Sequence, residues 1–213
     1  MKILVPLLIK PDSPKDWTEN AKRIESNLTF QNKEVVYYNE DVPRYQSLYA
    51  GEANARNNAL DKYLKDDHTH VFWIDTDIVE NDNDIIEKLL ELSTEDIVAP
   101  YVYIEDNERW GYKRFYDLDG FIDKDYNHFN YKQPCINYGH GQKLQEVKSV
   151  GACYVIPAHI YKKGLRYDPW STKKTGVEHM TLFEQIRDIC KVYATPTIEI
   201  RHAFLPKYGV NFR

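Results

Sequence analysis

Short, mostly apolar segments alternate with helical segments along the first half of the chain. The apolar segments are residues 2–9, 33–39, 70–74 and 96–104. Between them, residues 14–26 are a predicted helix, with Ser13 as its N-cap and Pro14 at its first position. Apolar residues recur at helical spacing in residues 54–65 and 83–92. Strands with long apolar runs are covered on both faces, and strands joined by helices run parallel. The alternation therefore predicts an α/β fold: a Rossmann-like, mostly parallel central sheet with helices on both faces.

The second half of the chain is less regular. Residues 105–146 are rich in Asp, Asn, Tyr and Gly and show little periodicity. After them, residues 147–157 and 195–206 are predicted strands, and residues 178–191 are a predicted helix. We expect one domain over residues 1–213, in which residues 105–146 form an irregular, variable insertion.

Composition excludes several classes of protein. A net charge of −5 and a pI near 5.8 are unlike those of a nucleic-acid binder, which is normally basic. The three cysteines form no C-x-x-C pair, which argues against a zinc ribbon or a disulfide framework and favours a reducing compartment. No apolar stretch reaches the ~18 residues of a membrane span. The N-terminal run MKILVPLLIK is interrupted by Pro6 and predicts a buried strand instead of a signal peptide. We therefore expect a cytoplasmic protein.

Two carboxylates follow the apolar run of residues 71–74. The run stops at Asp75, and Asp77 comes two positions later. In open α/β sheets the ligand crevice lies outside the carboxyl ends of the strands. In an extended segment, residues i and i+2 point to the same side, so these carboxylates would converge. Close carboxylates stay ionised only when a cation or hydrogen-bond donors compensate, and a hard divalent ion is the simplest compensation.

Other accounts of the two aspartates stay open. An N-cap in a strand-to-helix loop explains an aspartate equally well. An EF-hand loop starting at Asp75 fails, because Val79 and Glu80 stand where a ligand and a glycine are needed. A haloacid-dehalogenase-like phosphatase also has a strand that ends in Asp-x-Asp. It needs a further acidic pair after a later strand, whereas Asp96 begins its strand. The phosphatase is the second enzyme candidate.

Five segments resemble the GT-A fold glycosyltransferases, especially the family-2-like members with an Asp-x-Asp motif. In chain order they are ARNNAL (55–60), VFWIDTDI (71–78), SVGACYVIPAHIY (149–161), GVEHMTLFEQIRD (176–188) and IEIRHAFLP (198–206). Their order and spacing carry the resemblance, which spans the chain except for residues 105–146.

The resemblance implies a divalent metal site. Asp75 and Asp77 match the family's metal-binding pair, which holds Mn²⁺ or Mg²⁺ against the donor diphosphate, with the first aspartate also facing the ribose. His202 matches the late histidine that completes the metal shell. Imidazole suits Mn²⁺ better than Mg²⁺. On its own, His202 would be interpreted as an ordinary edge-strand histidine.

The resemblance also implies a nucleotide-sugar site. Arg56 matches a basic residue near the nucleotide, where its planar fork suits phosphate or carboxylate oxygens. Pro6, at the end of the first strand, would lie beside the nucleotide base. Gly151 and Ala152 match small residues that let the backbone approach the donor sugar. The plainer interpretations are a surface arginine on a helix and a packing glycine in a strand.

Glu178 matches the acidic residue at the start of the late helix, where inverting members carry their catalytic base. A carboxylate there takes the proton of the acceptor hydroxyl as it attacks. A first-turn glutamate that complements the helix dipole is the plainer interpretation. The family pattern is often Glu-Asp, whereas His179 follows here, so Asp168 is an alternative base and the stereochemistry stays open. Tyr167, Trp170 and Trp110 could stack on an acceptor sugar, although such aromatics more often pack locally.

The resulting hypothesis is a metal-dependent glycosyltransferase of the hexosyltransferase type. It would move a sugar from a UDP- or GDP-sugar to a hydroxyl of a glycan, lipid-linked or protein acceptor, with residues 105–146 shaping acceptor choice. Without a membrane span, any link to lipid-borne acceptors would be peripheral to a membrane. A nucleotidyltransferase is disfavoured because LLIKPDSPKDW contains no glycine. A non-catalytic carbohydrate- or nucleotide-binding protein on the same fold is the remaining alternative.

Overall fold

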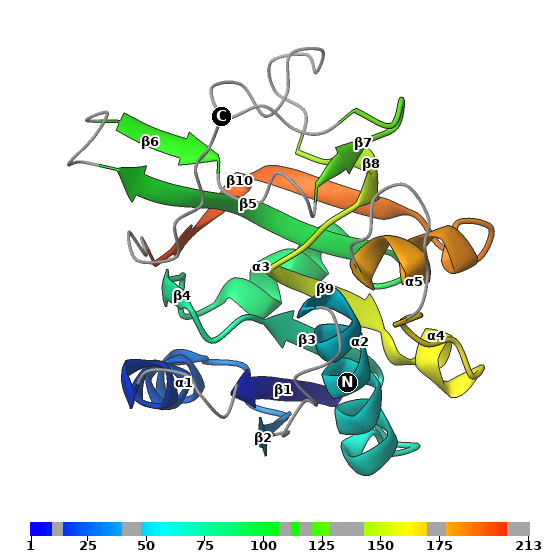
Figure 1. The fold of residues 1–213 in the computed structure, drawn as a ribbon, viewed down its shortest axis with the longest axis horizontal. Coiled ribbons are helices and arrows are strands. Elements are labelled where there is room, and N and C mark those ends of the chain that lie inside the picture. Colours follow the sequence, from blue (N-terminus) through cyan, green and yellow to red (C-terminus); the bar gives the residue numbers. More distant parts are fainter. Residues whose placement is uncertain are drawn as a thin grey trace.

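The computed structural model describes residues 1–9, 15–39, 48–106, 112–115, 121–127, 143–169 and 178–203 (Figure 1). The strands are β1 (Ile3–Ile9), β2 (Lys33–Asn39), β3 (His70–Ile74), β4 (Ile78–Glu80), β5 (Ile97–Asp106), β6 (Tyr112–Phe115), β7 (Ile122–Asp123), β8 (Gln145–Ser149), β9 (Cys153–Pro157) and β10 (Val192–His202). The helices are α1 (Lys15–Asn27), α2 (Leu48–Tyr63), α3 (Ile85–Leu92), α4 (Ala158–Lys162) and α5 (Glu178–Ile186).

The strands form one mixed sheet in the order β2-β1-β3-β9-β5-β10-β8-β7. Strands β2, β1 and β3 pair in parallel, and so do β5 and β10. Strand β9 is antiparallel to both β3 and β5, so these two groups of strands run in the same direction. The prediction of a mostly parallel central α/β sheet is confirmed, and β9 is the antiparallel strand at its centre.

The middle of the sheet is buried on both sides. Every residue of β3 and of β9 is buried, and successive side chains of a strand point to opposite faces. Helix α3 contributes Ile85, Ile86, Leu89 and Leu90 to the core, and these are the residues that its helical spacing predicted. Burying apolar area at roughly 25 cal/mol per Å² is the main force that holds such layers together.

Several predicted boundaries were wrong. The strand expected over 147–157 is two strands, β8 and β9, separated by Gly151 and Ala152. Ala152 has a φ of 54°, a left-handed backbone conformation that ends a strand. The helix expected over 178–191 ends at Ile186, and the last strand begins at Val192. Helix α2 begins at Leu48, six residues before the expected start.

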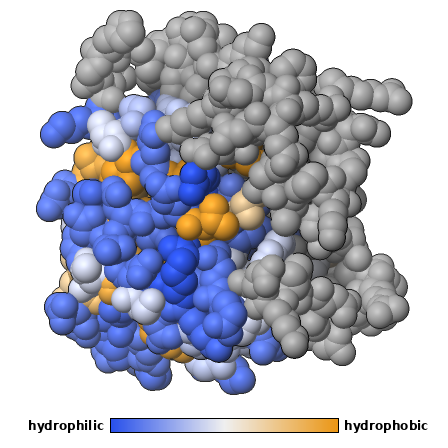
Figure 2. Space-filling view, turned by 90° about the vertical axis from the view of Figure 1, so that its left-hand side faces the viewer, coloured by the Kyte–Doolittle hydropathy of each residue, from blue (hydrophilic) through white to orange (hydrophobic). Residues whose placement is uncertain are grey.

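The carboxyl ends of the parallel strands lie at one end of the sheet. In Figure 1, β1, β3 and β5 point to the left, where β4 and the end of β10 also lie. Figure 2 looks at this end of the sheet, where the described residues are mainly hydrophilic, with apolar areas near the centre and at the upper left. A polar ligand would therefore meet a suitable surface here. Within the described ranges, no helix has both the length and the apolar character needed to cross a membrane.

Candidate functional site

The two aspartates lie in a tight turn after β3. The Ile78 N–H donates a hydrogen bond of 3.1 Å to the carbonyl of Asp75, which closes a four-residue turn. The segment is therefore not extended, and the expectation that alternation would make the carboxylates converge was wrong in its geometry. Each carboxylate instead has its own nitrogen partner. Arg56 Nη2 lies 3.1 Å from Asp75 Oδ1, and His202 Nε2 lies 3.0 Å from Asp77 Oδ2.

The Asp77–His202 pair is formed by chain segments 125 positions apart. Strand β4 pairs with the end of β10, with Ile78 opposite His202, and the Ala203 N–H donates to the Asp77 carbonyl at 2.8 Å. His202 is buried, with 5 % of its side chain exposed. Its Nδ1 lies 2.8 Å from the Ala203 carbonyl, which can only accept, so Nδ1 carries a proton and Nε2 faces Asp77.

The environment of His202 favours its cationic form in the absence of another cation. Burial lowers the pKa of His202, but the charge of Asp77 and the hydrogen bond to it outweigh burial, and the pKa is raised above its ordinary value. A divalent ion at the same place would take over this role. It would bind the Nε2 lone pair and leave Nδ1–H on the carbonyl, which is the usual outer hydrogen bond of a metal-bound histidine.

Asp77 and His202 fit a metal ion. Asp77 Oδ1 is buried and has no hydrogen-bond partner in the described part of the chain, and only 18 % of the Asp77 side chain is exposed. A buried carboxylate oxygen of this kind requires a donor or a cation. One oxygen and one imidazole nitrogen suit Mn²⁺. Within the described ranges, no three His, Cys, Asp or Glu side chains gather closely enough to hold an ion by themselves. Substrate oxygens and water would complete its shell.

Arg56 is a buried cation that holds Asp75. Only 4 % of its side chain is exposed, and its guanidinium carbon lies 4.8 Å from the centre of the Trp73 ring and 5.8 Å from that of Tyr167. The aromatic faces stabilise the buried charge, and Asp75 pairs with it. Asp75 is 37 % exposed, so the pair lies at the edge between core and solvent. The plainer interpretation of Arg56 as a surface arginine on a helix is therefore excluded.

The two rings beside Arg56 belong to a buried network of hydrogen bonds. Trp73 Nε1 donates to Tyr161 Oη at 3.0 Å, and Tyr167 Oη lies 2.7 Å from that oxygen and 2.6 Å from Tyr154 Oη. Burial raises the pKa of Tyr161 to about 12 and the pKa of Tyr167 well above its ordinary value, so both stay protonated. Tyr167 is 1 % exposed and cannot stack on an acceptor. Sequence reasoning missed Tyr154 and Tyr161, although both lie in the quoted segment 149–161.

The small residues lie beside the turn. Ala152 accepts a 2.8 Å hydrogen bond from the Asp75 N–H, so the turn between β8 and β9 adjoins the aspartates. Gly151 and Ala152 are both buried in the described structure. The position expected for Pro6 was wrong. It is buried in the middle of β1, three residues before the strand ends. The pairing of β1 with β3 ends at Leu4, and Pro6, which has no N–H to donate, lies beyond that end.

The catalytic base is less defined. Glu178 is the first residue of α5, but its side chain lies outside the described residues. Trp110 and Trp170 also lie outside them. Asp168 is exposed, and its N–H donates to Thr181 Oγ1 of α5 at 2.8 Å, which ties it to that helix. The structure thus brings together the metal-binding candidates Asp77 and His202. The assignment of Glu178 as the catalytic base stays a prediction.

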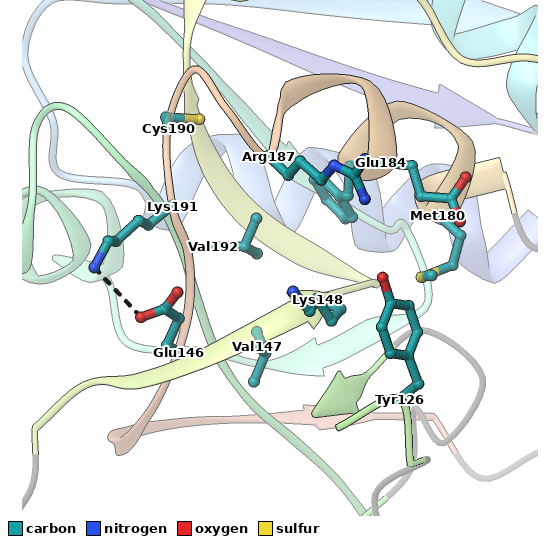
Figure 3. Close-up of a pocket in the computed structure, with 11 residues that line it drawn as sticks. Tyr126, Glu146, Val147, Lys148, Met180, Glu184, Arg187, Cys190, Lys191 and Val192 are labelled. Atoms are coloured by element: carbon teal, nitrogen blue, oxygen red, sulfur yellow. Dashed lines mark hydrogen bonds and ion pairs between the residues drawn. The ribbon is translucent and has the colours of Figure 1, made fainter. Parts of the chain in front are cut away.

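A small cavity of about 60 Å³ lies between α5, β8 and the start of β10 (Figure 3). Lys148, Arg187 and Tyr126 line it, and Lys191 pairs with Glu146 at its rim at 3.4 Å. None of the predicted site residues lines this cavity.

Comparison with known proteins identifies the fold. The solved structure of GalNAc-T7 with UDP, GalNAc and Mn²⁺ matches over 96 % of this chain and 44 % of its own, with a TM-score of 0.53 and 13 % identity. The structure of S. aureus TarS matches over 92 % of this chain and 37 % of its own, with a TM-score of 0.54 and 13 % identity. The chain has the GT-A glycosyltransferase fold.

This GT-A chain spans less than half the length of those two solved chains. The family model Anp1 matches residues 50–134, which contain most of α2, with Arg56, and the turn with Asp75 and Asp77. No curated protein matches the sequence. The part matched by the family model thus includes both aspartates, whereas His202 and Glu178 lie beyond it.

Proposed function

We propose that this protein transfers a hexosyl group from a nucleotide-sugar donor, a UDP- or GDP-sugar, to a hydroxyl of a glycan, lipid-linked or protein acceptor, using Mn²⁺ or Mg²⁺. The observation that carries the proposal is the Asp77–His202 pair. It joins the end of β3 to the end of β10 on a GT-A fold, with a buried carboxylate oxygen that has no partner in the described structure. Recognition of a donor diphosphate by a bound cation follows from this chemistry.

The roles of the residues follow from their surroundings. Asp77 and His202 would bind the metal, and the ion, when bound, would neutralise charge on the departing diphosphate. Arg56 holds Asp75 just beyond the carboxyl end of β3, where the 37 % exposed side chain of Asp75 can accept hydrogen bonds from the donor ribose. Gly151 and Ala152, next to Asp75, let the donor approach the backbone. Glu178 would accept the proton of the acceptor hydroxyl.

Two alternative functions, a phosphatase and a non-catalytic binding protein, can be distinguished from the proposed transferase. The GT-A fold removes the basis for a haloacid-dehalogenase-like phosphatase, which rested on a strand ending in Asp-x-Asp alone. A non-catalytic binding protein on the same fold would bind donor and metal without breaking the sugar–phosphate bond. Release of nucleoside diphosphate from the donor is therefore the deciding measurement.

The test is a donor-hydrolysis screen over UDP- and GDP-sugars with Mn²⁺, Mg²⁺ or chelator. We expect the native protein to release nucleoside diphosphate from one donor class only with a divalent ion. Asp77→Ala should lose this activity by 100-fold or more, because removing an interaction that stabilises developing charge typically costs about 10²–10³ in rate. Asp188→Ala is the matched control, since Asp188 is exposed on the turn after α5.

Thermal shift on the same proteins separates binding from catalysis. A ligand at 100 times its Kd stabilises the folded state by about 2.7 kcal/mol. We expect the donor to raise the Tm only with Mn²⁺, and Asp77→Ala to lose this dependence. Full activity of Asp77→Ala would remove the metal assignment. A metal-dependent shift without any hydrolysis or transfer would favour the non-catalytic binding protein.

A further inference from the structure

Helix α1 reaches the turn that carries the two aspartates. Its buried residues Ala21 and Ile24 face the core, and Asn20 and Arg23 lie three positions apart on an adjoining face. Figure 1 places α1 next to β4 at the carboxyl end of the sheet. The half-buried polar side chains of Asn20 and Arg23 are therefore close to residues 75–78, although more than 50 positions separate them in the sequence.

Asn20 donates to two carbonyls of the turn at once. Its Nδ2 lies 2.7 Å from the Thr76 carbonyl and 2.7 Å from the Ile78 carbonyl, which flank Asp77 on either side. A carboxamide has two N–H groups on one nitrogen, so it can bridge two acceptors in this way. The two bonds set the distance between these carbonyls, and Asp77 lies between them.

Arg23 orients the amide of Asn20. Arg23 Nε donates to Asn20 Oδ1 at 2.7 Å, which directs the Nδ2 group to the turn. Arg23 Nη2 also donates to the Ile78 carbonyl at 2.8 Å, so that oxygen accepts from both side chains. Hydrogen bonds from a charged donor are about twice as strong as neutral ones. The two residues therefore act as one unit.

Three further groups of the turn form hydrogen bonds with neighbouring segments. The Asp75 N–H donates to Ala152, the Asp77 carbonyl accepts from the Ala203 N–H, and Thr76 Oγ1 donates to the Leu8 carbonyl at 3.0 Å. These partners come from β1 and the turns beside β9 and β10. Within the described residues, the carbonyls of Thr76 and Ile78 are the groups of the turn that accept hydrogen bonds from side chains of α1.

We propose that Asn20, oriented by Arg23, is a positioning residue that holds the turn so that the Asp77 carboxylate faces His202 and the metal ion. This inference rests on the proposed function, because the ion is the ligand whose binding the turn would support. Outer residues that orient metal ligands typically change metal affinity by 10–100-fold when they are replaced. Asn20 touches neither the ion nor the donor and acts through the backbone.

The experiment measures two quantities on the native protein and on the variants Asn20→Ala, Asn20→Asp, Arg23→Ala and Lys22→Ala. The first is hydrogen exchange of the peptide covering residues 74–80, which reports the turn without any metal. The second is the Kd for Mn²⁺ from the electron paramagnetic resonance signal of the free ion. Lys22→Ala is the matched control, because Lys22 is exposed on the same helix and pairs only with Glu19 among the described residues.

We expect Asn20→Ala to speed exchange in this peptide and to weaken Mn²⁺ binding by tenfold or more, with Arg23→Ala intermediate and Lys22→Ala unchanged. Asn20→Asp removes both donors but adds a negative charge that by itself favours a cation, so weaker Mn²⁺ binding there reports the loss of geometry. Unchanged exchange, or faster exchange with unchanged Kd, overturns the positioning role. Failure of the native protein to bind Mn²⁺ overturns the metal-dependent function, and the role of Asn20 with it.

Discussion

Replacing Tyr167 with Phe removes one oxygen from the centre of the buried hydroxyl network. Tyr167 Oη bridges Tyr161 and Tyr154, at 2.7 and 2.6 Å, in a region closed to water. In Tyr167→Phe, Tyr161 still accepts from Trp73, but one of its two hydroxyl contacts is lost, and Tyr154 loses this partner as well. The ring itself is kept, so no cavity larger than a hydroxyl is left.

The expected loss of stability follows from these contacts. A buried polar group left without its partner costs about 1–3 kcal/mol. Most of the lost free energy comes from Tyr161. The loss at Tyr154 is smaller, because Tyr154 has a further interaction. We therefore expect the free energy of unfolding to fall by about 2 kcal/mol, which is a large share of the roughly 5–15 kcal/mol of a typical domain but leaves the protein folded.

The assay is urea unfolding followed by tryptophan fluorescence, with the slope of the transition used to check that the unfolded state is unchanged. Tyr126→Phe is the control, because Tyr126 is 54 % exposed and the loss of its hydroxyl should change stability by less than about 0.5 kcal/mol. Equal effects of the two substitutions would refute the argument, since they would show that the buried hydroxyl contacts contribute nothing measurable.

Two further predictions concern charges. Arg56→Lys keeps the charge but loses the planar contact with Trp73, so we expect the free energy of unfolding from urea titration to fall by about 1 kcal/mol; an unchanged free energy would mean that the guanidinium plane adds no stability. The hydrogen bonds from Lys65 and Lys2 lower the pKa of Glu34 to about 2. Its contribution is thus present above the unfolded value near 4.5 and lost as the pH falls toward 2. Glu34→Gln should therefore narrow the difference in Tm between pH 6 and pH 3, and an undiminished difference would contradict this.

Much of the fold could be predicted from local patterns. The apolar strands before residue 105 and helix α3 were expected within a few residues of their observed bounds. Burial on both faces requires nearly continuous apolar residues, and that requirement is visible in the sequence. The break at Gly151 and Ala152 was not visible, because apolar periodicity does not record the left-handed backbone conformation that Ala152 adopts beside Asp75.

The candidate site was predictable in part. The carboxyl end of β3 was expected to carry acidic residues facing a crevice, and Asp75 and Asp77 do follow that strand. The geometry was not predictable, because the same residues could form a turn or an extended segment. The hydrogen bond from the Ile78 N–H to the Asp75 carbonyl belongs to the turn. Pro6 lies in the middle of its strand because β1 pairs with β2 as far as Ile9. The length of that pairing depends on both strands and is not visible in the sequence of β1 alone.

The sequence by itself determined which segments would become strands, that they would be covered on both faces, and that two carboxylates would follow β3. Only the tertiary structure decided that β9 runs antiparallel between β3 and β5, that Arg56 lies over Trp73, and that Asn20 holds the turn beside Asp77. The physical reason is the separation in sequence of the residues that interact. Periodicity records whether each residue is buried, whereas partners 17 to 125 positions apart are selected by how the layers pack.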